Sequence, residues 1–253
     1  MQAETALLGF LVGLLVGLTG VGGAALLTPA LLWLGINPSV AVATDLFYNA
    51  VTKLFGGIQH LRQKTVDLAL VKMLAAGSVP AAVCAVLLLH AIPSLAVHRD
   101  DIIRHALGIV LVIVALATIV KQFYERIGAN RWQDRPLSEK KALTIAIGAA
   151  LGFIVGFTSI GSGSLFALAM MYFYRMSTAQ LVGTDIVHAF LLVAAAGGMH
   201  AFYGNIDYLL AVNLLLGSIP GVLIGSRLSA KVPGKPLRTF LAALILASGL
   251  KLL

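Results

Sequence analysis

Two stretches of small and polar residues decide the fold: Thr19-Gly20-Val21-Gly22-Gly23-Ala24 and Thr158-Ser159-Ile160-Gly161-Ser162-Gly163-Ser164. They interrupt two long apolar runs, at 3–35 and 142–173. Glycine weakens a helix by about 1 kcal/mol per residue, so each run is expected to form two short helices joined by an irregular turn. We call these two stretches the first and the second break.

The breaks belong to a duplication, because the two halves of the chain share motifs about 140 residues apart. The matching pairs are Thr44-Asp45 with Thr184-Asp185, Val66-Asp67 with Ile206-Asp207, and Gly77-Ser78-Val79-Pro80 with Gly217-Ser218-Ile219-Pro220. A duplicated membrane unit with interrupted segments at matching positions indicates a transporter built from two related halves.

Composition independently indicates an integral membrane protein. Hydrophobic residues make up 59% of the chain and charged residues 11%, and the mean hydropathy is +0.97. The net charge of +8 comes from basic residues in loops between apolar runs, so nucleic-acid binding is not expected. The single Cys84 has no partner for a disulfide or a metal site, and no metal or other cofactor is expected.

Hydropathy and charge predict how the chain crosses the bilayer. The apolar units are 3–35, 39–60, 67–90, 102–121, 142–173, 178–200, 206–226 and 237–253. If the two long units crossed once, the two sides would hold nine and seven loop cations; if they returned as re-entrant hairpins, the counts would be thirteen and three. The three would be Arg99, Arg104 and Lys251. The positive-inside rule therefore favours hairpins, with both termini extracytoplasmic.

The expected fold is an all-α integral membrane protein of two inverted-topology repeats. Each repeat would contain one broken helix pair, re-entrant or discontinuous, and three transmembrane helices. The repeats would span 1–121 and 142–253, with 122–141 as a cytoplasmic linker. Two full-width helices in each long unit are the alternative.

The breaks are the expected substrate site. Free N–H groups and the positive ends of helices beginning near Ala24 and Ser164 favour an anion, and nearby hydroxyls add donors. The alternative is close helix packing through small residues. The predicted substrate-binding residues are Thr19, Gly20, Gly22, Gly23, Asn49, Lys53, Thr158, Ser159, Gly161 and Ser162.

A row of polar residues is expected to face this site from the segment 39–60. Asp45, Asn49 and Lys53 share one helical face, and a charge inside the membrane is costly enough that this face must look inward. Lys53 is the candidate for direct contact with the anion. The alternatives are an ammonium that reaches the membrane surface, or one that pairs with Asp45 or Asp185.

Three titratable residues are candidates for coupling or gating: Asp45, Asp185 and His188. The alternative for the two aspartates is a cap in the first turn of a helix. His188 is about as well explained as a packing residue. Asp67 and Asp207 are expected to cap the helices that follow them.

The paired motifs resemble the TauE/SafE sulfite exporter family of membrane permeases. The likeness rests on residues 17–23 and 43–45 in the first half and on 156–162 and 183–185 in the second, and it covers nearly the whole chain. The resemblance implies a carrier in a prokaryotic-type inner membrane that exports small organosulfur anions, such as sulfite, sulfonates or sulfoacetate, coupled to an ion. A homodimer is one possible assembly of the protein, and the sequence does not decide its oligomeric state.

The expected function is therefore secondary transport by alternating access and not enzymatic turnover. Motifs of hydrolases, zinc proteases and ATP-binding loops are missing from the sequence. The alternatives kept open are a passive anion channel and an intramembrane enzyme on a sulfur compound with Asp185 and His188 as acid and base.

Overall fold

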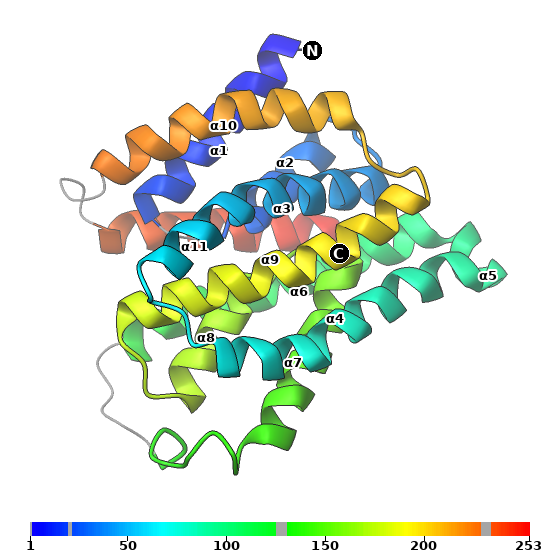
Figure 1. The fold of residues 1–253 in the computed structure, drawn as a ribbon. Helices are drawn as coiled ribbons and strands as arrows, with labels where there is room; N and C mark the ends of the chain where they lie inside the picture. Colours follow the sequence, from blue (N-terminus) through cyan, green and yellow to red (C-terminus); the bar gives the residue numbers. More distant parts are fainter. Residues whose placement is uncertain (1, 20–21, 125–130, 229–233) are drawn as a thin grey trace.

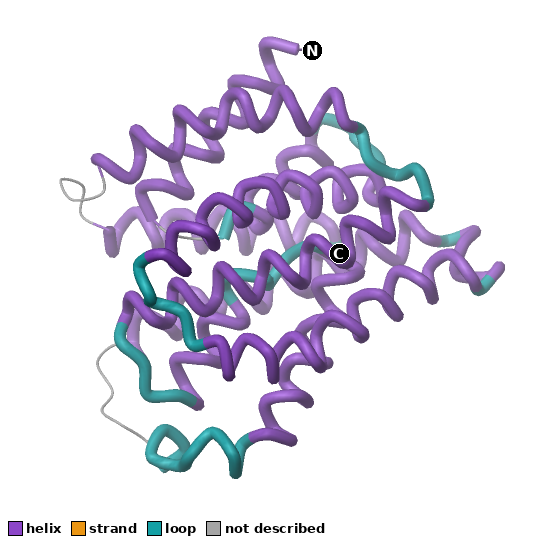
Figure 2. Tube along the Cα trace, in the orientation of Figure 1, coloured by secondary structure: helices purple, strands orange, loops and turns teal. Residues whose placement is uncertain are grey.

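The computed structural model describes residues 2–19, 22–124, 131–228 and 234–253, and these are almost entirely helical (Figures 1 and 2). The helices are α1 (Gln2–Thr19), α2 (Ala24–Trp33), α3 (Pro38–Arg62), α4 (Leu68–Ala91), α5 (Pro93–Val97), α6 (Arg99–Tyr124), α7 (Lys141–Thr158), α8 (Leu165–Phe173), α9 (Thr178–Phe202), α10 (Tyr208–Leu228) and α11 (Gly234–Leu252).

The apolar units of the sequence correspond to these helices. Within the described residues, five helices are long and apolar enough to cross a membrane, namely α4, α6, α7, α9 and α10. Helix α3 is longer than most of them but carries the polar row that contains Asp45 and Lys53, which lowers its hydropathy. The all-helical membrane class expected from the sequence is confirmed.

Both long units are interrupted where the glycines and serines predict. In Figure 2, loop segments lie inside the helical bundle as well as at its ends. The expectation of two short helices is wrong for the first member of each pair, since α1 and α7 have 18 residues each, about 27 Å of helix at 1.5 Å per residue. Only α2 and α8 are short, with 10 and 9 residues. The glycines of each break follow the C-terminal end of the longer helix. They do not fall at its centre, so they leave that helix intact.

Each broken unit returns to the end of the bundle at which it starts. Glu4 and Thr5 of α1 line one cavity together with Leu34 and Ile36, which follow α2. In the second half, the Lys140 ammonium donates to the carbonyl oxygen of Phe173 at 3.0 Å, joining the residues that flank α7 and α8. Each unit is therefore a hairpin with a long first helix and a short second helix.

Glycine contacts bind each long hairpin helix to a helix of the other half. Helix α1 runs parallel to α10, where Gly9, Gly13 and Gly17 meet the backbone of Leu214, Ser218 and Val222. Helix α7 runs parallel to α4 in the same way, with Gly148 against Leu74 and Gly152 against Ser78. A methyl group on these glycines would overlap the facing backbone, so they are required by packing.

The remaining pairs are reciprocal as well. Helices α3 and α9 cross antiparallel, with Gly57 beside Val187 and Gly197 beside Leu46, and α6 packs on α11. The hydroxyl of Thr184 accepts a hydrogen bond from the N–H of Asp67 at 3.0 Å, and Thr44 accepts from Asp207 at 3.2 Å. Each half therefore completes the packing of the other.

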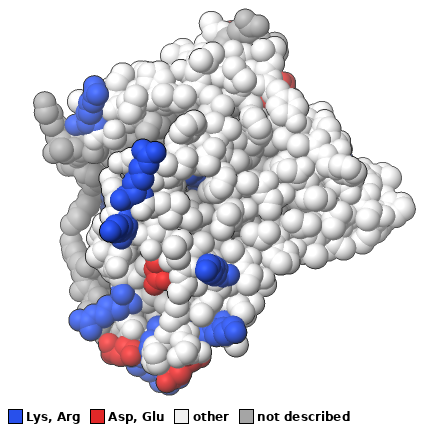
Figure 3. Space-filling model, in the orientation of Figure 1, with Lys and Arg blue, Asp and Glu red and all other residues white. Residues whose placement is uncertain are grey.

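Charges are distributed unevenly over the molecule. In Figure 3, Lys and Arg side chains gather toward one end of the visible face, and most of that face carries no charge. The uncharged area is what a surface in contact with lipid tails requires, because ionised groups are excluded from hydrocarbon.

Candidate functional site

The two breaks meet inside the bundle. A methyl group added at Gly163 would lie 3.6 Å from the Cα of Gly22, 3.8 Å from a carboxylate oxygen of Asp185 and 4.0 Å from the ammonium nitrogen of Lys53. Two chain segments about 140 residues apart therefore come into van der Waals contact beside a cation and a carboxylate. Gly20 lies outside the described residues.

Lys53 reaches across from α3 to the second break. Its ammonium donates to the carbonyl oxygen of Ser162 at 3.0 Å and to the hydroxyl at 3.1 Å. It also interacts electrostatically with Asp185 and Asp45. The Lys53 side chain therefore lies in the interior of the bundle and does not reach to the membrane surface.

Asp45, Asn49 and Lys53 lie on one face of α3, as their spacing predicts. The Asn49 amide donates to the Asp45 carboxylate and to the Asp45 carbonyl oxygen, both at 2.9 Å. Asp45 is fully buried, and Thr28 and Ser159 lie next to its carboxyl group. The hydroxyls of Thr28 and Ser159 are 3.1 Å apart, which links α2 of the first hairpin to the second break.

The backbone of the second break turns more sharply than a helix allows. Ser159 ends α7 in the left-handed region, with φ at +60°, and Gly161 has φ at +105°. Glycine adopts such angles readily, whereas serine does so at a cost that the surrounding contacts must offset. Here the N–H of Ser159 donates to Val155 at 2.7 Å and its hydroxyl donates to the carbonyl oxygen of Thr158.

The site residues predicted from sequence fall into two groups. One small cavity is lined by six of them: Gly22, Gly23, Asn49, Lys53, Gly161 and Ser162. Thr19, Thr158 and Ser159 do not line it. The hydroxyls of Thr19 and Thr158 donate to the carbonyl oxygens of Leu15 and Ile154, four residues earlier in their own helices, at 2.6 and 2.7 Å. In this conformation both hydroxyl protons are therefore used by the backbone.

The cavity is small. Its volume is about 10 Å³, at the lower limit of what one water molecule requires. Helices α2 and α8 start at this cavity, so their positive ends lie beside it. An anion larger than a water molecule does not fit this cavity in the present conformation.

The reading of Asp45 and Asp185 as first-turn caps is wrong. Helix α3 begins at Pro38 and α9 at Thr178, so both aspartates lie in the second or third turn. Ser177 caps α9 instead, and Gln180 completes a capping box with it. The caps expected at Asp67 and Asp207 are confirmed, because their side chains accept from the N–H of Leu70 and Leu210 at 3.0 and 2.9 Å.

His188 is buried and tied to a motif of the other half. Its Nε2 lies 2.8 Å from the hydroxyl of Ser78, and its ring packs on Phe166. The matching position in the first half is Tyr48, which lies against Ser218. This Tyr48 and His188 correspondence was visible in the repeat and was missed, as was the role of Thr28.

These features define a class: a multi-pass α-helical membrane protein with two broken hairpins that meet at a buried lysine. The model of the sulfite exporter TauE/SafE family matches residues 5–252. The chain therefore belongs to the TauE/SafE family, and it is a membrane transporter of that type.

The similar proteins are named as transporters. The chain is 59% identical over its full length to the full length of the probable membrane transporter protein YjnA of Bacillus subtilis (strain 168). It is 28% identical to the probable membrane transporter protein YfcA of Escherichia coli (strain K12), over 96% of this chain and 88% of that protein. YunE of Bacillus subtilis (strain 168), also a probable membrane transporter protein, is 24% identical over 97% and 95%. No solved structure matches the chain.

Proposed function

We propose that the protein exports a small organosulfur anion, such as sulfite, a sulfonate or sulfoacetate, by ion-coupled alternating access. The observation that carries the proposal is the contact of Gly22 with Gly163 beside the Lys53 ammonium. The family description, sulfite exporter, supplies the class of substrate.

Lys53 binds the anion in this proposal. Its ammonium now donates to Ser162, and an anion entering the cavity replaces that partner with a full negative charge. The N-termini of α2 and α8 add N–H donors and partial positive charge from opposite halves. Both halves must close on the anion for it to be fully coordinated.

Asp45 and Asp185 act in coupling. Both interact with Lys53, so the site without substrate already holds negative charge beside the cation. An arriving anion is favoured when a proton or another cation neutralises one of these carboxylates, which links anion movement to cation movement. His188 transmits this change to α4 through Ser78.

In this proposal, the conformation with the small cavity corresponds to the occluded state of the cycle. The reciprocal pairing of α1 with α10 and α4 with α7 supports two inverted repeats that rock against each other around the site. The basic end of the molecule faces the cytoplasm under the positive-inside rule, which places both termini outside in the cell inner membrane.

Counterflow in proteoliposomes tests the function. Vesicles holding the purified protein and unlabelled sulfite are diluted into labelled sulfite, with thiosulfate, a sulfonate and sulfate as competitors. A carrier gives a transient labelled accumulation that saturates with sulfite. Currents that do not saturate would show a channel, and chemical conversion of sulfite without net movement would show an enzyme.

A further inference from the structure

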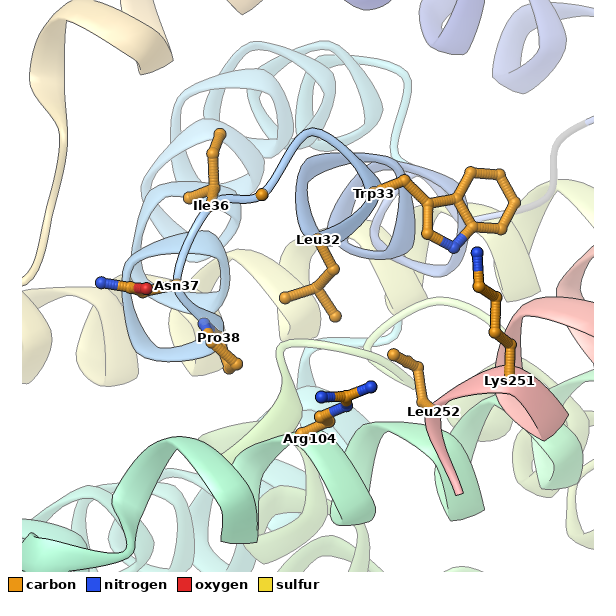
Figure 4. A pocket seen from close by; sticks show the side chains of 9 residues that line it. Leu32, Trp33, Ile36, Asn37, Pro38, Arg104, Lys251 and Leu252 are labelled. Atoms are coloured by element: carbon orange, nitrogen blue, oxygen red, sulfur yellow. The ribbon is translucent and has the colours of Figure 1, made fainter.

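A second cationic cavity lies away from the breaks, where α2 ends and α3 begins. It has a volume of about 350 Å³. In Figure 4, Arg104 points into it from α6, and Lys251 extends from α11 toward Trp33. The Lys251 ammonium lies 5.8 Å from the centre of the Trp33 ring, so three separate elements converge on this space.

The charge of the cavity is positive. None of the nine residues that line it in the described structure is acidic, and two are cations. The nearby Asp100 lies one turn before Arg104 and accepts a hydrogen bond from the N–H of Ser39 at 3.1 Å. Asp101, also on α6, is exposed. The two cations therefore face a space for a negatively charged group.

The size and lining of the cavity favour a ligand larger than a small inorganic anion. A water molecule takes up about 30 Å³ in the liquid, and an oxyanion a few times larger would leave most of the cavity empty. Leu32, Ile36 and Leu252 provide an apolar side next to the cations. The ligand that matches carries an anionic head and an apolar body.

The position of the cavity identifies that ligand further. Trp33, which lines the cavity and ends the apolar helix α2, is 51% exposed, and Leu34 after it is 55% exposed. Tryptophan at the end of a membrane helix lies at the level of the lipid headgroups. Arg and Lys side chains at that level form charge-assisted hydrogen bonds with a lipid phosphate.

We propose that this cavity binds the phosphate headgroup of an anionic membrane lipid, with Arg104 and Lys251 on the phosphate and Trp33 at the glycerol level. The site is separate from the transport site and does not depend on the transported substrate.

Native mass spectrometry of the protein released from detergent tests the proposal. Wild type, Arg104→Gln/Lys251→Gln and the matched control Arg62→Gln/Lys64→Gln are titrated with phosphatidylglycerol, with phosphatidylcholine, and with inorganic phosphate. The control removes the same charge from a loop at the other end of α3. We expect wild type and control to prefer phosphatidylglycerol, and the Arg104/Lys251 variant to bind it more weakly by roughly fivefold for each cation removed.

Three results would overturn the lipid site. The Arg104/Lys251 variant could keep the full preference for phosphatidylglycerol. The control could lose the preference to the same extent, which would show an effect of net charge only. Inorganic phosphate could displace the lipid from wild type, which would make the cavity a site for a free anion. Circular dichroism of both variants verifies that each is folded.

Discussion

At the scale of single residues, the site depends on polar groups that connect the first half to the second break. Lys53 of α3 bonds to Ser162, and the hydroxyl of Thr28 in α2 lies 3.1 Å from that of Ser159, so the second break is held from the opposite half. Such groups are buried away from water, and each needs its partner to offset the cost of burial.

Thr28→Val should destabilise the protein by about 1–2 kcal/mol, because Ser159 loses a buried hydrogen-bond partner. The matched control is Thr118→Val. Thr118 is also buried, but among the residues that the structure describes its hydroxyl bonds only to Val114 of its own helix, at 2.7 Å. Thermal unfolding in detergent measures both. Equal losses in the two variants would show that the link between the hairpins contributes nothing special.

The sequence predicted only in part which residues line the cavity where the breaks meet. The glycines of the breaks and the row from Asp45 to Lys53 could be placed, because a broken helix and a four-residue spacing have fixed geometric consequences. Which hydroxyls face the cavity could not be placed. A buried threonine bonds to its own helix or to a neighbour according to its rotamer, and packing decides the rotamer.

At the scale of helices, close backbone approach at glycines holds α1 against α10 and α7 against α4. A methyl group at Gly217 would overlap the carbonyl oxygen of Ala6, whereas a methyl group at Gly198 would meet no atom within 4 Å. These two glycines lie in similar helices and differ only in their neighbours.

Gly217→Ala should destabilise the protein by about 1–3 kcal/mol through overpacking. Gly198→Ala should be neutral or stabilising by up to about 1 kcal/mol, because alanine favours a helix over glycine. The unfolding midpoints of the two variants measure the difference. If Gly217→Ala were as stable as Gly198→Ala, α1 would not pack on α10 at this distance.

Helix boundaries were predictable where the sequence contains caps and not where it contains only small residues. Asp67 and Asp207 start α4 and α10 as expected. The start of α9 could have been read from Ser177 and Gln180, a capping box, and this would have excluded Asp185 as a cap. The full length of α1 and α7 was not predictable, because glycine permits a break without fixing its position.

At the scale of the whole molecule, the duplication explains why the halves exchange partners. Each hairpin packs on a helix of the other half, so the site forms only when both halves are folded. The volume of the site follows from how the halves dock, which no local pattern of residues determines. The small size of the cavity therefore could not be inferred from the sequence.

Cysteine labelling tests the membrane orientation. The proposed orientation places the basic end in the cytoplasm. In a Cys84→Ala background, an impermeant maleimide applied to intact cells should then label His98→Cys and not Arg135→Cys. Both positions are exposed to solvent in the structure, so disrupted cells should label both and serve as the control. Labelling of Arg135→Cys alone in intact cells would show that the protein has the opposite membrane orientation.

The most direct test of the central claim, that Lys53 holds the anion where the two breaks meet, is sulfite uptake into proteoliposomes by Lys53→Ala. Lys72→Ala, which removes an exposed lysine of α4, is the control. We predict a fall of roughly thirtyfold or more for Lys53→Ala, since losing one member of a buried charged contact costs about 2–5 kcal/mol, with Lys72→Ala unchanged and both proteins folded. Full uptake by folded Lys53→Ala would contradict the account.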